Sequence, residues 1–363
     1  MSIDELHMFR ALALAERGRG RTSPNPVVGA VVVDDEGVVV GRGSHEVAGG
    51  PHAEVYALDE AGTRARGATL YCTLEPCSHT GRTGPCAPKV VEAGIRRVVV
   101  ATEDPNPLVA GRGIALLRAQ GISVTVGVCA EAAHRLNPPF FTWIRQRRPF
   151  VTVKAALTLD GCVAAFPGVR TELTGAAANR FIHRERAEID AIGVGSGTVL
   201  ADNPRLTPRG AYRYRPLMRV VFDRRLRTPL HAALLSTTGA GPVIIMSTTT
   251  AARETPERLR SLGDAGARVE LVDPDAARGS FLPAALERLG ELGCLSMVVE
   301  GGPTVHSALW TAGLVDRVEL FVTPAIAGPG GLRWDVLPVG TMGSLAYAAA
   351  RPVGEDMLIE GHV

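Results

Sequence analysis

The hydrophobic positions of this chain fall into short strand-sized runs, separated by segments with the spacing of an amphipathic helix. Residues 8–17 carry apolar side chains on one helical face, which predicts a helix that packs by that face. Residues 27–33 are almost continuously apolar and rich in valine, which predicts a buried strand. Asp34-Asp35-Glu36-Gly37 has the composition of a hairpin turn, so residues 38–44 are expected to return as a second strand.

Strands and helices continue to alternate through the N-terminal part of the chain. Further strands are expected at residues 68–73, 97–101 and 122–126, and helices at residues 51–62, 86–94 and 111–120. The resulting order is strand, strand, helix, strand, helix, strand, helix, strand. It predicts an α/β fold in which a mixed sheet has helices on both faces.

A basic segment that ends in proline divides the chain. Residues 130–145 have helical spacing with a break at Asn137-Pro138-Pro139, and Gln146-Arg147-Arg148-Pro149 follows. The length of 363 residues exceeds the usual size of one domain, so two domains are expected. We place the boundary in the basic segment, which gives domains at residues 1–146 and 147–363.

The C-terminal part also alternates between strands and helices. Strands are expected at residues 150–154, 189–194, 219–222, 242–246 and 297–300, and a helix at residues 179–187. Residues 196–204 carry hydroxyl, carboxylate and amide side chains and are expected to form a loop. This order predicts a second α/β domain with a largely parallel sheet.

Composition and charge narrow the possible classes of function. With 46% hydrophobic and 21% charged residues, the chain is typical of a soluble globular protein. A formal charge of +2 gives no support for a nucleic-acid or membrane surface. The start of the chain lacks a signal-peptide pattern, and no apolar run reaches the roughly 20 residues needed to cross a bilayer. The six cysteines do not resemble a disulfide framework, so we predict a cytoplasmic protein. A homo-oligomer is compatible with the sequence.

One imidazole, one carboxylate and two thiols form the strongest chemical pattern in the chain. Pro51-His52-Ala53-Glu54 is followed by Pro76-Cys77 and, after a longer insert, by Cys86. Zinc nucleobase deaminases carry His-x-Glu and then Pro-Cys-x-x-Cys, in which the His and both Cys bind zinc and the Glu transfers protons. At a helix N-terminus, His52 and Glu54 can face two sides of one metal-bound water. Three protein ligands leave the fourth tetrahedral position to that water, as in catalytic zinc sites.

Two alternatives stay open for this pattern. His79 lies between the two cysteines and could replace Cys86 as the third ligand. The thiols could also be inert apolar residues of the core, as free cysteines often are.

Longer motifs around these residues resemble a known family. They are Pro24-Asn25-Pro26-x-Val28-Gly29, Pro51-His52-Ala53-Glu54, Thr73-Leu74-Glu75-Pro76-Cys77-Ser78-His79 with Gly81-Arg82-Thr83-x-Pro85-Cys86, and Asp104-Pro105-Asn106-Pro107. In these motifs the chain resembles the deaminase half of the bifunctional deaminase/reductase of bacterial riboflavin biosynthesis. The resemblance implies a cytidine-deaminase-like fold and hydrolytic deamination of a diaminopyrimidinone ribosylamino 5′-phosphate. It also implies zinc ligands His52, Cys77 and Cys86, proton transfer by Glu54, substrate contacts by Asn25, His79 and Asn106, and a closing loop at Gly81-Arg82-Thr83.

A glycine pair between a predicted strand and a predicted helix marks the C-terminal part. Backbone N–H groups at Gly301-Gly302-Pro303-Thr304 can approach a phosphate, although such turns are commonly structural. With Lys154, Thr158-Leu159-Asp160-Gly161 and residues 197–204, this turn resembles the reductase half of the same family, similar in fold to dihydrofolate reductase. The resemblance implies reduction of the ribose to ribitol with NADPH. It implies cofactor contacts by Leu157, Thr198, Asp202, Gly302, Pro303, Thr304, Val305, His306 and Ser307, and substrate contacts by Lys154, Arg186, Leu206, Arg209 and Glu300, with Arg186 and Arg209 able to grip a 5′-phosphate.

Two positions depart from the reductase pattern. Cys162 stands where the family usually has Lys or Arg, and Glu172 where it has a Trp that would line the nicotinamide pocket. They motivate the alternative of a deaminase whose C-terminal domain binds ligand without reducing it. An RNA-editing deaminase is a further alternative, against which the near-neutral charge and the 5% aromatic content count. A purely structural zinc module would leave Glu54 without a role.

Overall fold

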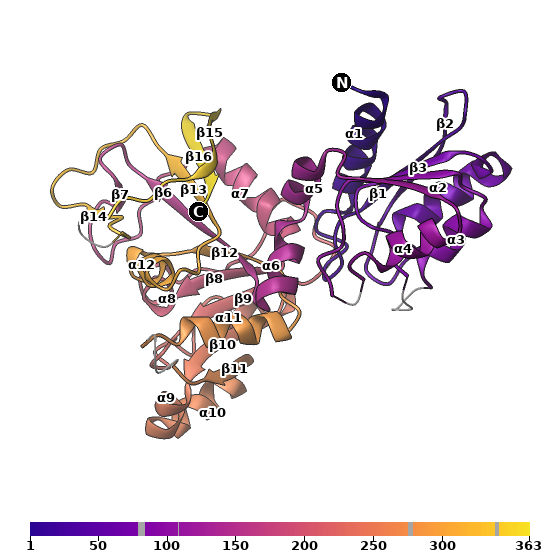
Figure 1. Cartoon of the computed structure of the whole chain (residues 1–363). Helices are drawn as coiled ribbons and strands as arrows, with labels where there is room; N and C mark the ends of the chain where they lie inside the picture. Colours follow the sequence, from indigo (N-terminus) through magenta and orange to yellow (C-terminus); the bar gives the residue numbers. More distant parts are fainter. Residues whose placement is uncertain (79–83, 108, 275–278, 338–340) are drawn as a thin grey trace. The chain divides into compact units, whose positions relative to one another are not determined.

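The computed structural model describes residues 1–78, 84–107, 109–274, 279–337 and 341–363 (Figure 1). The chain forms two compact units, Met1–Gln146 and Arg147–Val363, and each is described by itself below. In the described parts of the chain, no helix is long and apolar enough to cross a membrane.

A five-stranded sheet forms the centre of the first unit. Its order is β2-β1-β3-β4-β5, with β1 (Gly29–Val33), β2 (Val39–Ser44), β3 (Thr69–Cys72), β4 (Arg97–Val100) and β5 (Ser123–Val126). Strand β1 pairs antiparallel with both β2 and β3, whereas β3, β4 and β5 are parallel to one another. The predicted mixed sheet is therefore confirmed.

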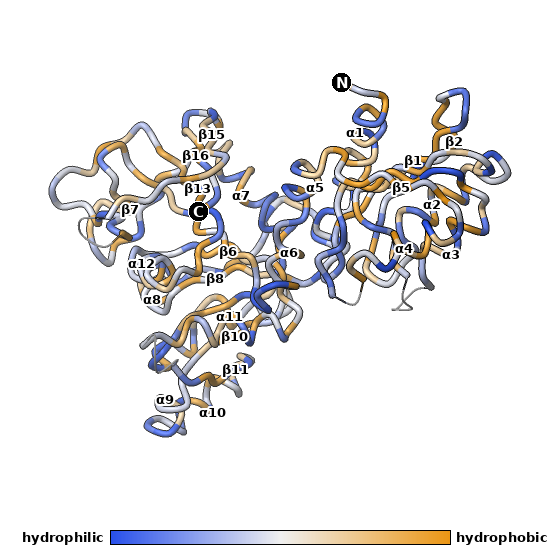
Figure 2. Tube along the Cα trace, viewed as in Figure 1, coloured by the Kyte–Doolittle hydropathy of each residue, from blue (hydrophilic) through white to orange (hydrophobic). Residues whose placement is uncertain are grey.

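Helices cover both faces of this sheet. They are α1 (Ile3–Ala15), η1 (Glu16–Gly18), α2 (Ala53–Ala61), η2 (Gly62–Ala65), α3 (Cys86–Glu92), α4 (Arg112–Ala119), α5 (Ala130–Leu136) and α6 (Pro138–Gln146). Ala30 and Val32 of β1 pack in one core with α2, α3 and α4, while Val31 and Val33 pack in a second core with α1 and α5. Successive side chains of a strand point to opposite faces, so β1 is buried on both sides and is hydrophobic along its length (Figure 2).

Two glycines of β2 allow helix α2 to lie directly on the sheet. A Cβ atom at Gly41 would be 2.0 Å from the carbonyl oxygen of Ala57, and one at Gly43 would be 1.9 Å from that of Ala53. Any side chain at either glycine would push the helix away. Because His52 is the N-cap residue of α2, this close contact also fixes the position of its imidazole.

A nine-stranded sheet forms the centre of the second unit. Its order is β11-β10-β9-β8-β12-β6-β13-β16-β15, with β6 (Phe150–Leu157), β8 (Ala191–Gly195), β9 (Met218–Phe222), β10 (Val243–Thr248), β11 (Ala267–Val272), β12 (Ser296–Glu300), β13 (Arg317–Val322), β15 (Ala346–Val353) and β16 (Asp356–His362). The strands from β11 to β13 are parallel, and β16 and β15 complete the sheet antiparallel. The prediction of a largely parallel sheet is confirmed. A small antiparallel pair, β7 (Cys162–Ala164) and β14 (Leu332–Arg333), lies apart from it.

Helices cover both faces of the second sheet as well. They are α7 (Ala176–Glu188), α8 (Ser196–Asp202), η3 (Leu235–Ala240), α9 (Thr249–Glu254), α10 (Pro256–Asp264), α11 (Leu282–Glu291) and α12 (Pro303–Thr311). Val220 of β9 packs in a core with α11 and α12, and the next residue, Val221, packs in another core with α8, α9 and α10. The unit is thus a second three-layer α/β arrangement.

Helix α8 occupies a segment that we expected to be a loop. Val199 is only 1% exposed and packs in the core, which stabilises the helix in spite of the low helix propensity of Ser196 and Gly197. The helix ends where Asn203 adopts a left-handed conformation with φ of 43°. Tertiary packing has here overridden the local preference.

Candidate functional site

Three potential metal ligands converge at the N-termini of two helices in the first unit. His52 caps α2, Cys86 is the first residue of α3, and Cys77 lies between β3 and α3. Nδ1 of His52 lies 3.1 Å from Sγ of Cys86 and 3.5 Å from Sγ of Cys77. The three ligand atoms all lie within 4.8 Å of one another. His79, the alternative third ligand and predicted substrate contact, lies outside the described residues, as does Gly81-Arg82-Thr83.

The polypeptide around the two thiols holds them together. The N–H of Ala87 donates to the carbonyl oxygen of Cys77 at 3.0 Å, and the N–H of Cys86 donates to Sγ of Cys77 at 3.4 Å. The hydrogen bond from the Cys86 thiol, assisted by His52, lowers the pKa of Cys77 to about 4 although burial opposes this. An imidazole nitrogen with thiolate sulfurs is the donor set that zinc prefers, so these residues fit that ion.

Glu54 lies in the first turn of α2, two residues from the imidazole ligand. Its side chain is 3% exposed, and its Oε2 atom has no hydrogen-bond partner among the described residues. Burial raises the pKa of Glu54 to about 7. A carboxyl group that titrates near neutral pH can both accept and release a proton, as general acid–base catalysis requires.

Asn25 is linked to the start of α2 through a buried histidine. Nδ2 of Asn25 lies 3.1 Å from Nε2 of His45, and Nδ1 of His45 lies 3.0 Å from the carbonyl oxygen of Pro51. Because a carbonyl oxygen can only accept, Nδ1 of His45 donates to Pro51 and Nε2 accepts from the Asn25 amide. The link ends directly before His52, which places Asn25 close to the potential metal ligands. Sequence reasoning had assigned no role to His45.

Glu75 orders the loop that contains Asn106. It is 3% exposed and lies two residues before Cys77. Its carboxylate accepts hydrogen bonds at 2.9–3.2 Å from the backbone N–H groups of Asp104, Gly111, Gly113 and Ile114. Both ends of the Asn106 loop are thereby tied to the segment that carries one thiol. The sequence pattern contained Glu75 but gave no reason to assign it this role.

A cavity of about 1900 Å³ opens at the carboxyl ends of the parallel strands of the second unit. Ligands of open α/β sheets usually bind at this edge. The residues predicted to contact the substrate of the reduction all line the cavity: Lys154, Arg186, Leu206, Arg209 and Glu300. The structure therefore brings together side chains that are up to 146 residues apart in sequence, from Lys154 to Glu300.

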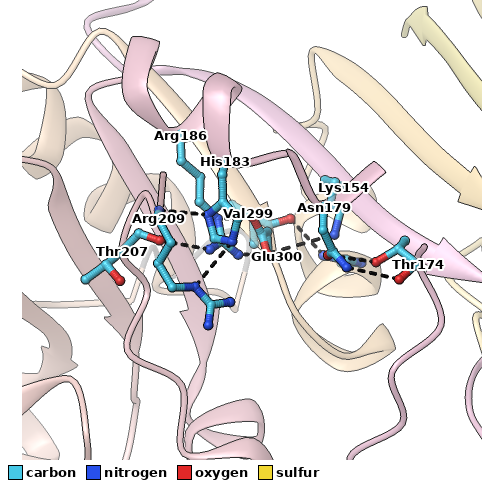
Figure 3. Close-up of polar contacts among 10 residues, drawn as sticks. Lys154, Thr174, Asn179, His183, Arg186, Thr207, Arg209, Val299 and Glu300 are labelled. Carbon is cyan, nitrogen blue, oxygen red and sulfur yellow. Dashed lines mark hydrogen bonds and ion pairs between the residues drawn. The ribbon is translucent and has the colours of Figure 1, made fainter. Parts of the chain in front are cut away.

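A charged cluster forms one wall of this cavity (Figure 3). Nε and Nη2 of Arg186 donate to the two oxygens of Glu300 at 2.9 and 2.6 Å, and Nη1 donates to the carbonyl oxygen of Thr207 at 3.2 Å. Nζ of Lys154 lies 3.9 Å from Glu300 Oε2. Burial opposes ionisation of Glu300, but the charges of Arg186 and Lys154 outweigh it and lower the pKa of Glu300 to about 2. The forked edge of Arg186 is thus occupied by a carboxylate.

Arg209 is the second arginine predicted to hold a phosphate. Its backbone N–H donates to Nδ1 of His183 at 3.1 Å, and its side-chain Nε lies 3.3 Å from Nε2 of the same ring (Figure 3). The side chain is exposed and lines the cavity. Arg209 therefore presents its guanidinium to a ligand more openly than Arg186 does.

Only some of the residues predicted to contact the cofactor line the cavity. Those that line the cavity are Thr198, Asp202, Gly302, Pro303, Thr304 and Val305. The Thr198 hydroxyl accepts a hydrogen bond from the N–H of Gly302 at 3.2 Å, which ties α8 to the turn before α12. Within the part of the chain that the structure describes, the cavity lining does not include Leu157, His306 or Ser307.

The imidazole of His306 is buried inside the fold, away from the cavity. It is 0% exposed, its Nε2 lies 3.1 Å from the carbonyl oxygen of Val299, and its Nδ1 accepts from the indole N–H of Trp334 at 3.0 Å. Burial lowers the pKa of His306 to about 4, which keeps the ring neutral. Its side chain links β12 to the segment around Trp334, in contrast to the cofactor contact that we expected.

The two positions that depart from the family pattern have different surroundings. Cys162 is 1% exposed at the start of β7. Glu172 lines the cavity, and its carboxylate lies 2.8 Å from Nη2 of Arg170 in an exposed ion pair. A pair of charged side chains therefore stands where the family pattern has an aromatic ring.

Three arginines that line the cavity were not predicted from the sequence. Arg224, Arg225 and Arg227 lie in the turn after β9 and line the cavity. The signal was present as a basic run, Asp223-Arg224-Arg225-Leu226-Arg227, at the end of a predicted strand. A basic run of this kind more often lies on a solvated surface, so its position at the cavity could be recognised only from the structure.

Comparisons with known proteins give each unit a counterpart. Residues 1–102 match the family model of the cytidine and deoxycytidylate deaminase zinc-binding region, and residues 149–347 match that of the RibD C-terminal domain. The chain is 42% identical to riboflavin biosynthesis protein RibD of Aquifex aeolicus, over 98% of each sequence. It is similar to the solved structure of Acinetobacter baumannii RibD, with 35% identity and a TM-score of 0.87 over 99% of this chain and 98% of that one.

A second solved structure agrees with this match. The diaminohydroxyphosphoribosylaminopyrimidine deaminase/5-amino-6-(5-phosphoribosylamino)uracil reductase of Thermotoga maritima is 34% identical, with a TM-score of 0.85 over 99% of this chain and 98% of that one. The first unit thus has a cytidine-deaminase-like fold, and the second is a RibD C-terminal domain similar to dihydrofolate reductase. Since the relatives align along almost their whole length, the chain belongs to the RibD family, the bifunctional deaminase/reductases of riboflavin biosynthesis.

Proposed function

We propose that residues 1–146 deaminate a diaminopyrimidinone ribosylamino 5′-phosphate with zinc, and that residues 147–363 reduce the ribose of the product to ribitol with NADPH. The Thermotoga maritima relative is named for a deaminase and a reductase of such compounds. One observation carries the deaminase assignment: an imidazole and two thiols lie within 4.8 Å of one another, beside a buried carboxyl group.

Each residue of the first site has a separate task in this proposal. His52, Cys77 and Cys86 would hold the metal. Bound zinc supplies a Lewis acid that makes water nucleophilic at neutral pH. Glu54 takes a proton from the attacking water and delivers it to the departing amino nitrogen, so that ammonia can leave. Asn25, His79 and Asn106 are the proposed contacts to the pyrimidine.

The second site has room for a cofactor and a substrate together. Its volume of about 1900 Å³ exceeds the roughly 300–1,000 Å³ of ordinary small-ligand pockets. Thr198, Asp202 and residues 302–305 are the proposed contacts to NADPH, which supplies the reducing equivalent when bound. Lys154 donates a hydrogen bond to the ribose. Arg209 binds the 5′-phosphate, because the forked edge of Arg186 is engaged by Glu300.

The deaminase proposal is tested by Glu54→Gln, with zinc content and ammonia release measured on the same preparation. We expect zinc content equal to wild type and no ammonia release above background, because the amide cannot accept the proton. Asp59→Asn, an exposed change on the same helix, is the matched control and should release ammonia normally. Undiminished ammonia release by Glu54→Gln would show that Glu54 transfers no proton in this reaction.

A deaminase with a second domain that binds but does not reduce is the competing function. The charged pair Arg170–Glu172 at the cavity wall favours it, because neither residue can replace the flat ring of the family pattern. Purified protein is mixed with the deaminated substrate and NADPH, and the nicotinamide absorbance is followed. A falling absorbance supports the bifunctional enzyme, and a flat trace supports the competing function.

We further propose that the protein works in the cytoplasm and acts on small molecules alone. Free thiols at Cys77 and Cys86 suit a reducing compartment, where a zinc–thiolate site persists. Assembly into a homo-oligomer is part of the proposal and is measured by light scattering of the zinc-loaded protein.

A further inference from the structure

Four ionisable side chains form a row across four neighbouring strands of the second sheet. Lys154 of β6 pairs with Glu300 of β12 on one side and with Glu319 of β13 on the other. Glu319 in turn pairs with Glu360 of β16. Paired residues of neighbouring strands point to the same face of a sheet, on strands about 4.8 Å apart. The row therefore leads from Glu300 and Lys154, which line the cavity, to Glu319 inside the domain.

Glu319 is a buried carboxyl group that none of the roles proposed above uses. It is 0% exposed, and neither of its oxygens accepts a hydrogen bond from an N–H or hydroxyl group in the described parts of the chain. Nη2 of Arg317 lies 2.8 Å from Oε1 in an ion pair that lacks the geometry of a hydrogen bond. Because an unsatisfied buried acceptor is unfavourable, Glu319 needs a further donor.

Glu185 of α7 supplies this donor. Helix α7 lies on the same face of the sheet, because its Ala178 and Ile182 pack in one core with Phe321, two residues after Glu319. A hydrogen bond joins the carboxyl groups of Glu185 and Glu319. An ionised carboxylate can only accept, so one member of the pair carries a proton.

The surroundings place this proton on Glu185. Nη2 of Arg317 is shared by two acids, since it pairs with both Glu319 and Glu360. Among the ion pairs of the described ranges, none joins Glu185 to a cation. Burial and the charge of Glu319 raise the pKa of Glu185 well above its ordinary value. At neutral pH the Glu185–Glu319 pair therefore stores one proton.

Lys154 lies between this pair and the acid at the cavity wall. Its Nζ is 3.9 Å from Oε2 of Glu300 (Figure 3) and 5.6 Å from the centre of the Phe321 ring. Phe321 and Glu319 are two residues apart on one face of β13, so the ammonium group extends over the strand that carries Glu319. The stored proton is thus next in the row to a residue that lines the cavity.

Reduction of the ribose consumes one proton. Hydride forms a C–H bond at the anomeric carbon, the bond from that carbon to the ring oxygen breaks, and the electron pair left on the oxygen takes up the proton. Lys154 is proposed above to bind the ribose, so its ammonium group can give this proton. Each turnover then leaves a neutral amine. Its side chain is only 11% exposed, which restricts protonation from solvent while the cavity is occupied.

We propose that Glu185 and Glu319 form a proton store that returns a proton to Lys154 after each reduction. The proposal rests on the proposed reductase function and deepens it. Glu319 gives a proton to the Lys154 amine and receives that of Glu185 in its place. The pair, left with two negative charges, takes up one proton from solvent by way of Glu360, whose side chain is 19% exposed. Neither Glu185 nor Glu319 touches the substrate, and both act through Lys154.

The first measurement needs no turnover. The infrared difference between wild-type full-length protein and Glu185→Gln at neutral pH should contain the C=O stretch of a protonated carboxyl group, and the band should shift in D2O. Glu188→Gln, an exposed change on the same helix, is the matched control and should leave this band in place. Absence of the band from the wild-type protein would overturn the proposal.

The second measurement separates the first turnover from the later ones. Glu185→Gln keeps a hydrogen-bond donor to Glu319 but has no proton to release. After rapid mixing with NADPH and the deaminated substrate, the first turnover should run at the wild-type rate, because Lys154 starts with its own proton. The steady-state rate that follows should be at least about tenfold lower, as for the loss of an acid–base group. Glu319→Gln is a second variant with the same expectation, and Glu188→Gln should match wild type in both phases.

Three outcomes of this experiment would count against the proposal. An equal fall in both phases would give the pair a purely structural role, and no fall in either phase would show that Lys154 regains its proton without it. A flat nicotinamide trace from the wild-type protein would refute the proposed reduction itself. In that case a carboxyl band that Glu185→Gln removes would still establish the protonated pair, so the two failures are distinguishable.

Discussion

Arg186 and Glu300 form a forked ion pair inside the cavity of the second domain, with N–O distances of 2.9 and 2.6 Å. Their side chains are 13% and 15% exposed. Removing one member of a buried pair leaves an uncompensated charge and costs about 3–5 kcal/mol of stability. The pair therefore holds the Glu300 carboxylate in a fixed orientation, 3.9 Å from the ammonium group of Lys154.

The first prediction concerns the fork of this pair. Arg186→Lys keeps the charge but cannot donate two parallel hydrogen bonds, so Glu300 loses its orientation. We expect kcat/KM for NADPH-dependent reduction to fall at least about tenfold, the equivalent of one charge-assisted hydrogen bond. The drop in nicotinamide absorbance measures it, and ammonia release from the first domain serves as the internal control.

A matched change on the same helix separates this effect from a general disturbance of α7. Arg184→Lys alters an exposed arginine and should leave reduction at the wild-type rate. If Arg186→Lys also reduced substrate at that rate, the fork would be unnecessary for the orientation of Glu300.

The second prediction concerns metal removal. Extraction of zinc with a chelator should abolish ammonia release, because His52, Cys77 and Cys86 then have no cation to present to water. Reduction of the already deaminated substrate should continue, since the cavity of the second domain contains none of these ligands. Ammonia and NADPH assays on one chelated sample check both statements. Added zinc should restore ammonia release, and a chelated protein that still deaminates would refute the metal assignment.

The cluster of His52, Cys77 and Cys86 was predictable because the signal lies in short motifs of the sequence. His52 and Glu54 belong to one short motif, and Cys77 and Cys86 follow nine residues apart, so residue types and spacing already indicate the three potential ligands. Strand β1 was equally clear, because its five residues are buried on both faces and form an unbroken apolar run. Motifs and apolar runs of this kind depend only on residues that are close together in sequence, so they can be recognised without the tertiary structure.

Other features depended on contacts that no local pattern records. Arg186 and Glu300 are 114 residues apart, and only the sheet brings them together, so the sequence could not identify Glu300 as the partner of Arg186. The turn with Arg224, Arg225 and Arg227 could be assigned to the cavity only from the structure. Helix α1 is different, because it begins at Ile3 instead of residue 8. The Ser2–Glu5 capping box that starts it was visible in the sequence and was not used.

The third prediction concerns the contact between α4 and the segment before Cys77. A Cβ atom at Gly113 would lie 1.9 Å from the carbonyl oxygen of Pro76 and 3.2 Å from Oε1 of Glu75. Gly113→Ala should therefore displace the N-terminus of α4 and weaken the hydrogen bonds to Glu75. We expect a loss of about 1–3 kcal/mol in the stability of the first domain, together with a raised KM for deamination.

A milder variant tests whether the Glu75 carboxylate itself matters. Glu75→Gln replaces one acceptor oxygen by a donor that faces backbone N–H groups, so the Asn106 loop should loosen while zinc stays bound. Faster hydrogen exchange across residues 104–107 would follow. Unchanged exchange and unchanged KM would mean that the loop is held by other contacts.

The last prediction concerns the pH dependence of stability in the second domain. Burial lowers the pKa of His306 from 6.5 to about 4. Between pH 6.5 and pH 4, His306 is therefore protonated in the unfolded chain but neutral in the folded protein. The contribution of His306 to the free energy of unfolding is complete above about pH 6.5 and is lost as the pH falls toward 4, by an amount on the order of 3 kcal/mol. In His306→Leu this part of the pH dependence should disappear, although the variant is less stable at high pH because the indole N–H of Trp334 loses its acceptor. Urea unfolding of both proteins, followed by tryptophan fluorescence from pH 8 to pH 5, measures the two slopes. Equal slopes would show that the buried ring does not resist protonation as its surroundings indicate.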